Sequence, residues 1–459
     1  MKSVLRKTLW FVAAAAIVQI VFFGLLVAGQ AVPDKAIADN LAVDIHNGNY
    51  GPDGLPDRMG SNSDTFTECI VAATGLGHDG ENLFVRAAYM PRLGSCKGGA
   101  APILKLAAGE QLPSNQVASY SKYWAGYTVL TRPSIALFGL TGMRIISGAL
   151  LLFSALTAVV VLGKRTNMWA AAGLFIPMAL ASNLMSTPSS SFSQAISISV
   201  IFFGVAITAW GAGKSMKWTI FGVGLSAALF CYVDLLTTPA IPWAFSTVTA
   251  AGVVYAKTRR SRPTLIVGVV AAVVWIVAFA GTWVSRWVFA AMFLGIRTTY
   301  KTMVSNIEFR TAGDNALVQH VVFAPTAANW NYWLGHISTA VFTLVLCAVV
   351  IVVALLLTWR RHGARTVAVW PMLGLSAVVV VAWWEALSNH SQIHMFFTNR
   401  GFPAMLGVLL FAALMLWGLP KAGTARRSLE ASPPWSSEGA GKHSAEAPPV
   451  QMAVAAAND

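Results

Sequence analysis

Long apolar runs, separated by short polar connections, dominate the sequence. A transmembrane helix takes about 20 mostly apolar residues, and ten runs are of that order. They are residues 9–29, 143–163, 167–185, 192–212, 217–234, 239–257, 264–285, 336–358, 367–387 and 402–419. The pattern predicts an all-α polytopic membrane protein with about ten transmembrane helices.

The basic residues indicate how these helices are oriented. Dense clusters occur before the first run and then in every second connection, at 164–165, 214–217, 257–262, 359–365 and 421–427. Because cytoplasmic loops are enriched in Lys and Arg, we expect a multi-pass plasma-membrane protein with both termini in the cytoplasm. The stretch AGQA at 28–31 allows a cleaved signal peptide instead, but the apolar run before it is longer than a signal core, which favours an uncleaved anchor.

Two of the outer connections are long, residues 30–142 and 286–335, and loops of such length are often functional. The remaining chain to residue 423 is assigned to the transmembrane domain. Residues 424–459 are rich in Ser, Pro, Ala and Glu, which predicts a disordered cytoplasmic tail.

Composition agrees with a membrane protein, because only 11% of the residues are charged against about 25% in soluble domains. The net charge of +14 follows from the cytoplasmic clusters, and no soluble basic module suggests nucleic acid.

Cys69 and Cys96 lie in the first outer loop and predict a disulfide there. Cys231 and Cys347 lie inside apolar runs and predict packing.

Asp64 and Glu68 are four residues apart, just before an apolar stretch. On a helix they share one face near the N-terminus. One interpretation is an ordinary helix cap by Ser63 or Asp64. The other is a general base at the membrane surface that deprotonates an acceptor hydroxyl.

The next candidate residues stand at predicted outer ends of helices. Arg132 and Arg144 suit phosphate recognition, although snorkelling to lipid headgroups explains them equally. Asp234 and Arg286 suit a substrate site. The ordinary interpretations are that Asp234 caps the next helix or that it pairs with Arg286 across helices.

The stretch WWEALSNHSQIHMFFTNRG at 383–401 concentrates polar groups between two apolar runs. His390 and His394 have the spacing of one helical turn, and Glu385 would complete a divalent-metal site. Together with Arg400, the two histidines also suit a phosphate or pyrophosphate group. We favour the phosphate interpretation, with no cofactor required.

Five stretches resemble a set of bacterial membrane proteins similar to the GT-C class of glycosyltransferases. They are SDTFTEC (63–69), YSKYWAGYTVLTRP (120–133), VDLLTTP (233–239), GTWVSRW (281–287) and NHSQIHMFFTNRG (389–401), the last adding Asn389 to the candidates. The resemblance implies transfer of a sugar from a polyprenyl-phosphate carrier to an extracytoplasmic glycan or protein. It places the catalytic acid on Asp64, with Glu68 second. The paired acids common in that class are replaced here by single acids, at 34, 39, 44, 53, 57 and 64.

The working hypothesis is therefore a GT-C-like enzyme in which Asp64 is the base. Its phosphate ligands are Arg132, Arg286, Arg400, His390 and His394. A transporter or flippase, and a non-catalytic membrane protein of envelope assembly, remain the alternatives. The apolar runs carry no charged residues at their centres, which favours chemistry at a membrane surface over a transport path.

Overall fold

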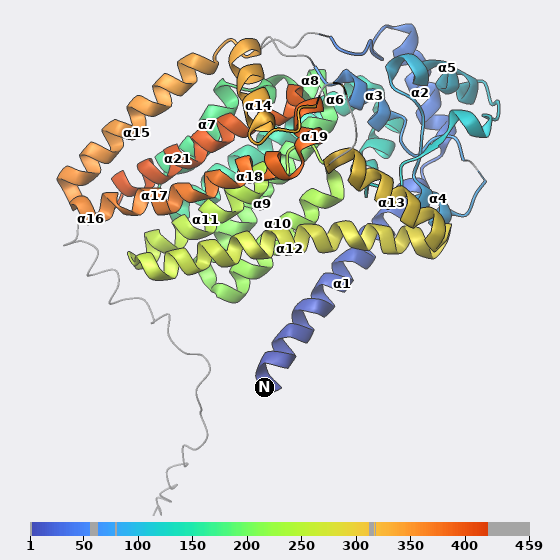
Figure 1. Cartoon of the computed structure of the whole chain (residues 1–459). Helices are drawn as coiled ribbons and strands as arrows, with labels where there is room; N and C mark the ends of the chain where they lie inside the picture. Colours follow the sequence, from blue (N-terminus) through green and yellow to red (C-terminus); the bar gives the residue numbers. More distant parts are fainter. Residues whose placement is uncertain (1, 56–62, 79, 312–315, 317, 421–459) are drawn as a thin grey trace, which may run out of the picture. The chain divides into compact units, whose positions relative to one another are not determined.

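The structure is a computed structural model that describes residues 2–55, 63–78, 80–311, 316 and 318–420. The described chain is almost wholly helical (Figure 1). Two short antiparallel strands, β1 (Pro91–Arg92) and β2 (Ala118–Ser119), pair in the segment before α6. The predicted tail from residue 424 lies outside the described residues.

The elements follow one another along the chain in two groups. The segment that begins the chain contains α1 (Lys2–Gln30), α2 (Asp34–His46), α3 (Thr65–Ala72), α4 (Leu83–Tyr89), α5 (Cys96–Ala107) and η1 (Ser114–Gln116). The rest contains α6 (Thr128–Arg165), α7 (Met168–Leu180), η2 (Asn183–Ser186), α8 (Thr187–Ser190), α9 (Phe192–Lys214), α10 (Met216–Val233), α11 (Ala240–Thr258), α12 (Ser261–Leu294), α13 (Ile296–Thr311), α14 (Ala324–His336), α15 (Ala340–His362), α16 (Ala364–Val367), α17 (Val369–Gly374), η3 (Leu375–Ala377), α18 (Val378–Ala386), α19 (Ser388–Ile393), α20 (Met395–Thr398) and α21 (Gly401–Trp417).

Within the described residues, eight helical segments are long and apolar enough to cross a membrane. They are Leu9–Gln30, α6, α9, α10, α12, α15, Ala364–Ala386 and Met395–Trp417. The run predicted at 167–185 is a pair bent by 76°, Met168–Leu180 followed by Asn183–Ser190, which makes a ninth span if counted as one. The run predicted at 239–257 forms α11, a 19-residue helix. Its Ser and Thr residues make it less apolar than the others, and it is not among the eight.

Helix α9 lies at the centre of the bundle and packs against α6, α10 and α11. Of its apolar window, 78% is buried, against 17% for α1 and 28% for α6, α12 and α15. Small residues explain the close packing, because a side chain added at Gly204 or Gly211 would collide with α10. The outer helices instead expose apolar side chains such as Val12, Phe153 and Val345, as lipid-facing helices do.

The basic clusters at 164–165, 214–217, 257–262 and 359–365 lie at one end of this bundle, which we call the basic end. Arg165, at the end of α6, lies against Gly213 of α9, and Lys257 of α11 donates to the Gly213 carbonyl oxygen at 3.5 Å. The connection from α15 to α16 is at the same end (Figure 1). The opposite end carries α2–α5, α13, α14 and α19, and we call it the loop end.

The first long loop is folded around the predicted disulfide. Cys69 of α3 and Cys96 of α5 are bonded to each other, while Cys231 and Cys347 are buried free thiols. Helix α6 begins at Thr128, inside the segment 30–142 that the sequence assigns to this loop. That helix breaks at Gly139, whose φ of +63° is rarely open to other residues.

The segment 286–335 that the sequence assigns to the second loop is largely helical. It contains the end of α12, which continues to Leu294, together with α13 and most of α14. The polar stretch at 383–401 contains α19 and α20, and several of its polar side chains are buried.

A buried ion triad ties the first loop to the bundle. Asp34 of α2 accepts from Arg86 of α4 and from Arg132 of α6, both at 2.7 Å. Burial of Asp34 favours the neutral acid, but the two guanidinium groups outweigh it and hold the pKa of this carboxyl below its usual value. Arg132 also donates to the carbonyl oxygens of Gly29 and Val32. The triad therefore joins α1, α2, α4 and α6.

Replacing Asp34 with Asn should destabilise the protein strongly. Removing one member of a buried ion pair costs about 3–5 kcal/mol, because the remaining charge is left uncompensated. The matched control is Asp39→Asn on the same helix, since Asp39 is half-exposed and pairs with Lys35, a contact worth about 0–1 kcal/mol. Thermal unfolding in detergent measures both, and equal midpoints for the two variants would contradict the structural role of the triad.

Candidate functional site

Asp64 is buried at the loop end of α9. It is the N-cap of α3, where one carboxylate oxygen accepts from the backbone N–H of Thr67 at 3.2 Å. The other oxygen accepts from the side-chain amide of Gln194, near the start of α9, at 2.9 Å. Burial raises the pKa of Asp64 to about 6, although these hydrogen bonds partly offset the effect. Asp64 therefore caps α3, as one interpretation predicted. The pKa of its carboxyl group is at the same time raised towards neutral pH.

Glu68 is held more tightly, one turn further along α3. Arg144 of α6 donates to one of its oxygens through Nη2 at 2.5 Å and Nε at 3.2 Å. The backbone N–H of Phe192, the first residue of α9, donates to the other oxygen at 2.9 Å. Burial raises the pKa of Glu68, and the Arg144 charge partly counteracts it. With both oxygens occupied, Glu68 is better placed to position α3 against α6 and α9 than to take up a proton.

A polar cavity of about 280 Å³ opens beside the two acids. Ser63 and Thr65, the neighbours of Asp64, line it together with Arg144. The remaining lining residues are Gly48, Asn49, Gly51, Leu55, Ser186, Ser189 and Ser190. Side-chain hydroxyls and amides of this density match a ligand that carries several hydroxyl groups.

Asp64 is joined through Gln194 to Arg400, one of the predicted phosphate ligands. The side-chain oxygen of Gln194 accepts from Arg400 Nη1 at 2.7 Å, and Arg400 Nε donates to Asn183 of the bent segment at 2.7 Å. Neither Gln194 nor Asn183 was singled out from the sequence, because amides within apolar segments carry no motif. Their position at predicted outer ends of spans was the available signal.

The two histidines belong to a second cluster, centred on Arg310 of α13. Arg310 hydrogen-bonds the His390 ring and the Tyr123 hydroxyl. The other His390 ring nitrogen lies 2.6 Å from the carbonyl oxygen of Leu236. The His394 ring stands next to that of His390, with 4.8 Å between the centroids. Arg310 was missed from the sequence because nothing in the second loop marked it.

This second cluster is strongly cationic. Lys122 lies over the rings of Tyr120 and Tyr123, and Arg92 lies over the Tyr120 ring. Burial, followed by repulsion from Arg310 and Arg92, lowers the pKa of Lys122 to about 8.

The histidines in this cluster are neutral at physiological pH. Burial and the Arg310 charge lower the pKa of His390, and burial, Arg310 and Lys122 lower that of His394 to about 4. Three cations therefore stand together, an arrangement that a bound anion would relieve. We call Arg92, Lys122, Arg310, His390 and His394 the cationic cluster.

Helix α9 passes both Asp64 and Asp234. Gln194 binds Asp64, and Ser197, three residues later on α9, lies beside Asp234. The charge of Asp234 acts on Tyr123, whose hydroxyl is hydrogen-bonded to Arg310 of the cationic cluster. Because three residues advance a helix by about 4.5 Å along its axis, the two acids lie against α9 within one turn of each other, and the cluster is reached from Asp234 through Tyr123.

The remaining predicted residues lie elsewhere. Arg286 donates to three carbonyl oxygens, those of Ala87, Ala88 and Ser121. The proposed pair between Asp234 and Arg286 does not form, since Asp234 accepts from Thr237 instead. Arg132 is in the ion triad. Asn389 donates to the carbonyl oxygen of Phe309 on α13 at 3.4 Å, which places it beside the cluster.

The alternative metal site is not assembled in this arrangement. Glu385 accepts from the hydroxyl of Thr326 at 2.6 Å and from the backbone N–H of Phe323 at 2.9 Å, so its carboxylate is directed at α14 rather than at the histidines. Among the described residues, no group of three His, Cys, Asp or Glu side chains is placed to hold a metal ion.

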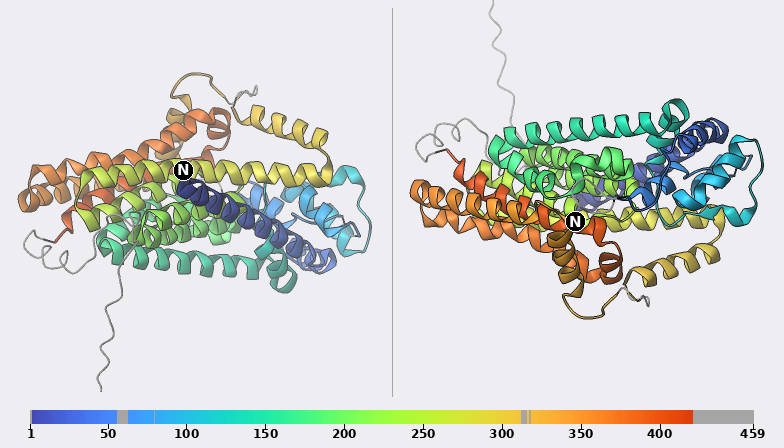
Figure 2. Two further views of the ribbon diagram at one scale, coloured as in Figure 1. Left: turned by 90° about the horizontal axis from the view of Figure 1, so that it is seen from below. Right: turned by 90° about the horizontal axis from the view of Figure 1, so that it is seen from above.

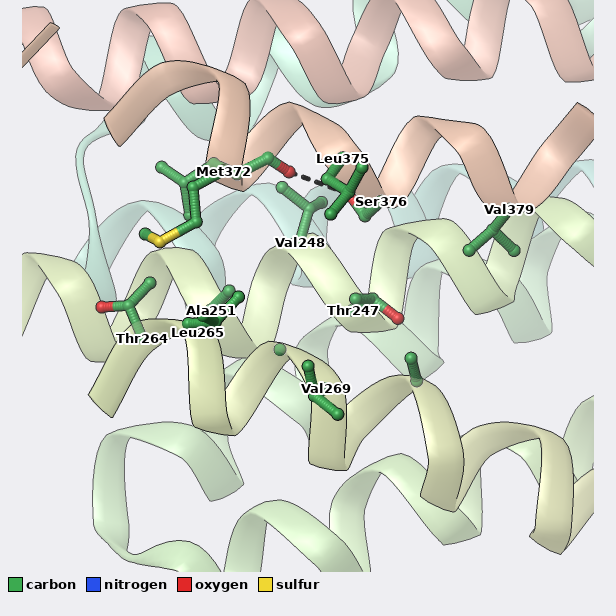
Figure 3. Close-up of a pocket in the computed structure, with 13 residues that line it drawn as sticks. Thr247, Val248, Ala251, Thr264, Leu265, Val269, Met372, Leu375, Ser376 and Val379 are labelled. Atoms are coloured by element: carbon green, nitrogen blue, oxygen red, sulfur yellow. Dashed lines mark hydrogen bonds between the residues drawn. The ribbon is translucent and has the colours of Figure 1, made fainter. Parts of the chain in front are cut away.

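A second cavity, of about 160 Å³, is apolar (Figure 3). It lies between α11, α12 and the segment from α17 to α18, and Val248, Leu265, Val269 and Val379 are among its lining residues. The Ser376 hydroxyl at its wall is satisfied by the carbonyl oxygen of Leu373 at 3.1 Å. No ionisable residue lines this cavity, so it offers no catalytic group.

Inorganic pyrophosphate should raise the thermal unfolding midpoint of the protein by binding the cationic cluster. At ten times its dissociation constant, a ligand of the native state adds about 1.4 kcal/mol to the free energy of unfolding. The shift should disappear in Arg310→Gln and persist in Arg361→Gln, whose arginine lies at the basic end over Trp417. An equal shift in wild type and Arg310→Gln would rule out the cluster as the anion site.

The chain was also compared with known proteins. No protein-family model, no curated protein and no solved structure matches it. The site is thus described by its own residues. A carboxylate with a raised pKa stands beside a hydroxyl-lined cavity, and a cationic cluster lies at the same end of the bundle, opposite the basic loops.

Proposed function

We propose that this protein is a GT-C-like glycosyltransferase that moves a sugar from a polyprenyl-phosphate carrier to an extracytoplasmic acceptor of the cell envelope. One observation carries the proposal: the Asp64 carboxylate and the cationic cluster lie at the same end of the bundle and are connected through α9, Asp234 and Tyr123. Transfer from a lipid phosphate requires a base for the acceptor and positive charge for the leaving phosphate, and these two sites supply them.

The location of the two sites supports an extracytoplasmic reaction. All of the candidate groups lie at the loop end, while the dense Lys and Arg clusters lie at the basic end. Because basic loops are retained in the cytoplasm, the loop end faces outwards and both termini face the cytoplasm. A carrier lipid of the outer leaflet reaches the loop end without crossing the membrane.

The cationic cluster suits the leaving group of the reaction. As the bond between the anomeric carbon and the phosphate oxygen breaks, the electron pair passes to that oxygen. Arg310, Lys122 and Arg92 lie where they would compensate the developing negative charge, and buried charges act more strongly than charges in water. Neutral His394 adds a hydrogen-bonding group to the phosphate without further repulsion, whereas both ring nitrogens of His390 are bonded to Arg310 and to the Leu236 carbonyl oxygen and so hold Arg310 in place.

Asp64 is the group that we assign as the general base. It takes the proton of the acceptor hydroxyl while the acceptor oxygen bonds to the anomeric carbon, so that sugar transfer leaves a protonated Asp64 and a lipid phosphate. A base with a pKa near the working pH is the most effective, and the pKa of Asp64 is raised to about 6. The carboxylate is buried and does not itself line the cavity, so an acceptor must displace one of its hydrogen-bond partners to reach it.

The other acids of the first loop have structural partners, which favours Asp64 further. Asp34 belongs to the ion triad, and Asp44 accepts from the backbone N–H of Leu140 at the break in α6. Asp53 accepts from the backbone N–H of Cys96. Asp57 lies outside the described residues.

A transporter or flippase for lipid-linked or polar solutes is the second candidate. The observation that favours it is the bent pair at α7 and α8, because broken helices with polar contacts are typical of transport proteins. In such proteins the broken helices meet at the centre of the membrane, whereas Asn183 and Arg400 meet at the loop end. The transferase remains our first proposal.

Replacing Asp64 with Asn should lower the rate of sugar transfer about 10²–10⁴-fold, the contribution of a general base. Asparagine keeps the oxygen that accepts from Thr67, so the α3 cap should survive and thermal unfolding should change little. The assay follows labelled sugar leaving a polyprenyl phosphate in reconstituted membranes, with Asp39→Asn as control. Transfer by Asp64→Asn at the wild-type rate would exclude Asp64 as the base.

The rate of transfer should also depend on pH through Asp64. The residue acts as a base only when ionised, so the rate should be constant well above its pKa of about 6 and should fall about tenfold per unit below it. Initial rates from pH 5 to 8 at saturating donor test this. A profile that is flat across pH 6 would point to a different base.

A further inference from the structure

Helix α13 has an unusual distribution of side chains. Four of its large apolar residues recur every three or four positions, at Ile296, Tyr300, Val304 and Ile307, which places these four along one stripe of the helix, while Phe309 lies outside it. All four are exposed, from 40% for Ile307 to 79% for Ile296. A helix that packs on a protein by its apolar stripe would show the reverse.

The face that α13 turns towards the protein is polar. Thr299, Asn306 and Arg310 are its buried residues. Arg310 reaches the cationic cluster, and the segment packs against α19. The polar face of α13 is therefore turned towards the protein, and its apolar stripe is left for something outside the chain.

The remaining exposed residues complete the pattern of an interfacial helix. Arg297, Lys301, Ser305 and Glu308 follow the apolar residues by one position and form a polar stripe beside the apolar one. Arg, Lys and Tyr next to an apolar stripe are typical of helices that lie at the headgroup level of a bilayer.

The position of α13 along the chain identifies the surface that it can reach. It starts two residues after α12, separated from it only by Gly295. The exposed apolar residues of α12, Val284, Val288 and Met292, precede Ile296 at the same spacing of four. Figures 1 and 2 show α13 turning back from the end of α12 at the periphery of the loop end.

We propose that α13 is an interfacial helix whose apolar stripe is seated in the outer boundary of the lipid bilayer, with Arg297 and Lys301 among the headgroups. Val321, Val322 and Phe323, which are more than 60% exposed, form a second apolar segment between α13 and α14. This seating explains how a helix with an outward apolar stripe can hold Arg310 towards the interior of the protein. The proposal for α13 requires no particular reaction, so its test is independent of the transferase proposal.

The test compares neighbouring positions on the same helix. Spin labels are attached at Val304→Cys on the apolar stripe and at Ser305→Cys on the polar stripe, in a background where the free thiols Cys231 and Cys347 are replaced by Ala. Each protein is reconstituted into nanodiscs that contain phosphatidylglycerol. Collision with oxygen, which partitions into lipid, is then compared with collision with a water-soluble nickel chelate. Ile307→Cys and Glu308→Cys repeat the comparison one turn later.

The label at 304 should favour oxygen by several-fold over the label at 305, and 307 should repeat this difference relative to 308. Equal access of the nickel chelate to 304 and 305 would show that the stripe faces water and would overturn the proposal. Exclusion of both reagents from 304 would also overturn it, because a protein surface would then cover the stripe. A thermal midpoint equal to that of the unlabelled protein confirms that each variant is folded.

Discussion

The loop end of this bundle is governed by one constraint, namely that a charge removed from water must be compensated within hydrogen-bond distance. Asp34, Glu68, Arg132, Arg286 and Arg400 are all almost completely buried, and each has found partners that fix a loop segment to a transmembrane helix. The disulfide between Cys69 and Cys96 adds a covalent tie inside the first loop. These contacts turn a long connection of mixed composition into a folded layer over the end of α9.

The same constraint separates structural groups from candidates for chemistry. Arg286 is saturated by backbone carbonyl oxygens, and Glu68 is saturated by Arg144 and the backbone of α9. Asp64 differs, because its partners are a backbone N–H and a neutral amide rather than a guanidinium group. In the cationic cluster, Arg92, Lys122 and Arg310 stand beside two neutral histidines. Among the described residues, this carboxylate and this cluster are two places where charge compensation is incomplete.

Much of the architecture was predictable from the sequence, since membrane spans and basic loops can be recognised from local composition. The positions of most apolar helices, the meeting of basic clusters at one end and the disulfide all follow from such patterns. Tertiary partners do not. One prediction paired Asp234 with Arg286. Instead, Asp234 accepts from Thr237 in the following turn, and Arg286 donates to backbone carbonyl oxygens. Residue spacing cannot reveal partners of this kind. Arg310, Gln194 and Asn183 were missed because a single polar residue in a helix carries no motif until its neighbours are known.

Helix α13 joins the membrane surface to the chemistry proposed for the loop end. Its inner face supplies Arg310 to the cluster, and its outer stripe is the part for which we propose lipid contact. A carrier phosphate that arrives from the outer leaflet would meet the cluster next to this helix. Substrate delivery and the position of the key cation would then depend on the same element.

The central claim is that a lipid phosphate binds at the cationic cluster, and Lys122 reports on it directly. Its lowered pKa, about 8, makes it reactive towards an acylating reagent at pH 8, and a bound phosphate would both cover it and restore its proton. Mass spectrometry of the wild-type protein in nanodiscs can follow acylation of Lys122 as polyprenyl phosphate is added, with exposed Lys105 as the internal control. We predict that labelling of Lys122 falls saturably while labelling of Lys105 is unchanged. Labelling of Lys122 at the same rate across the full range of polyprenyl phosphate would contradict the account.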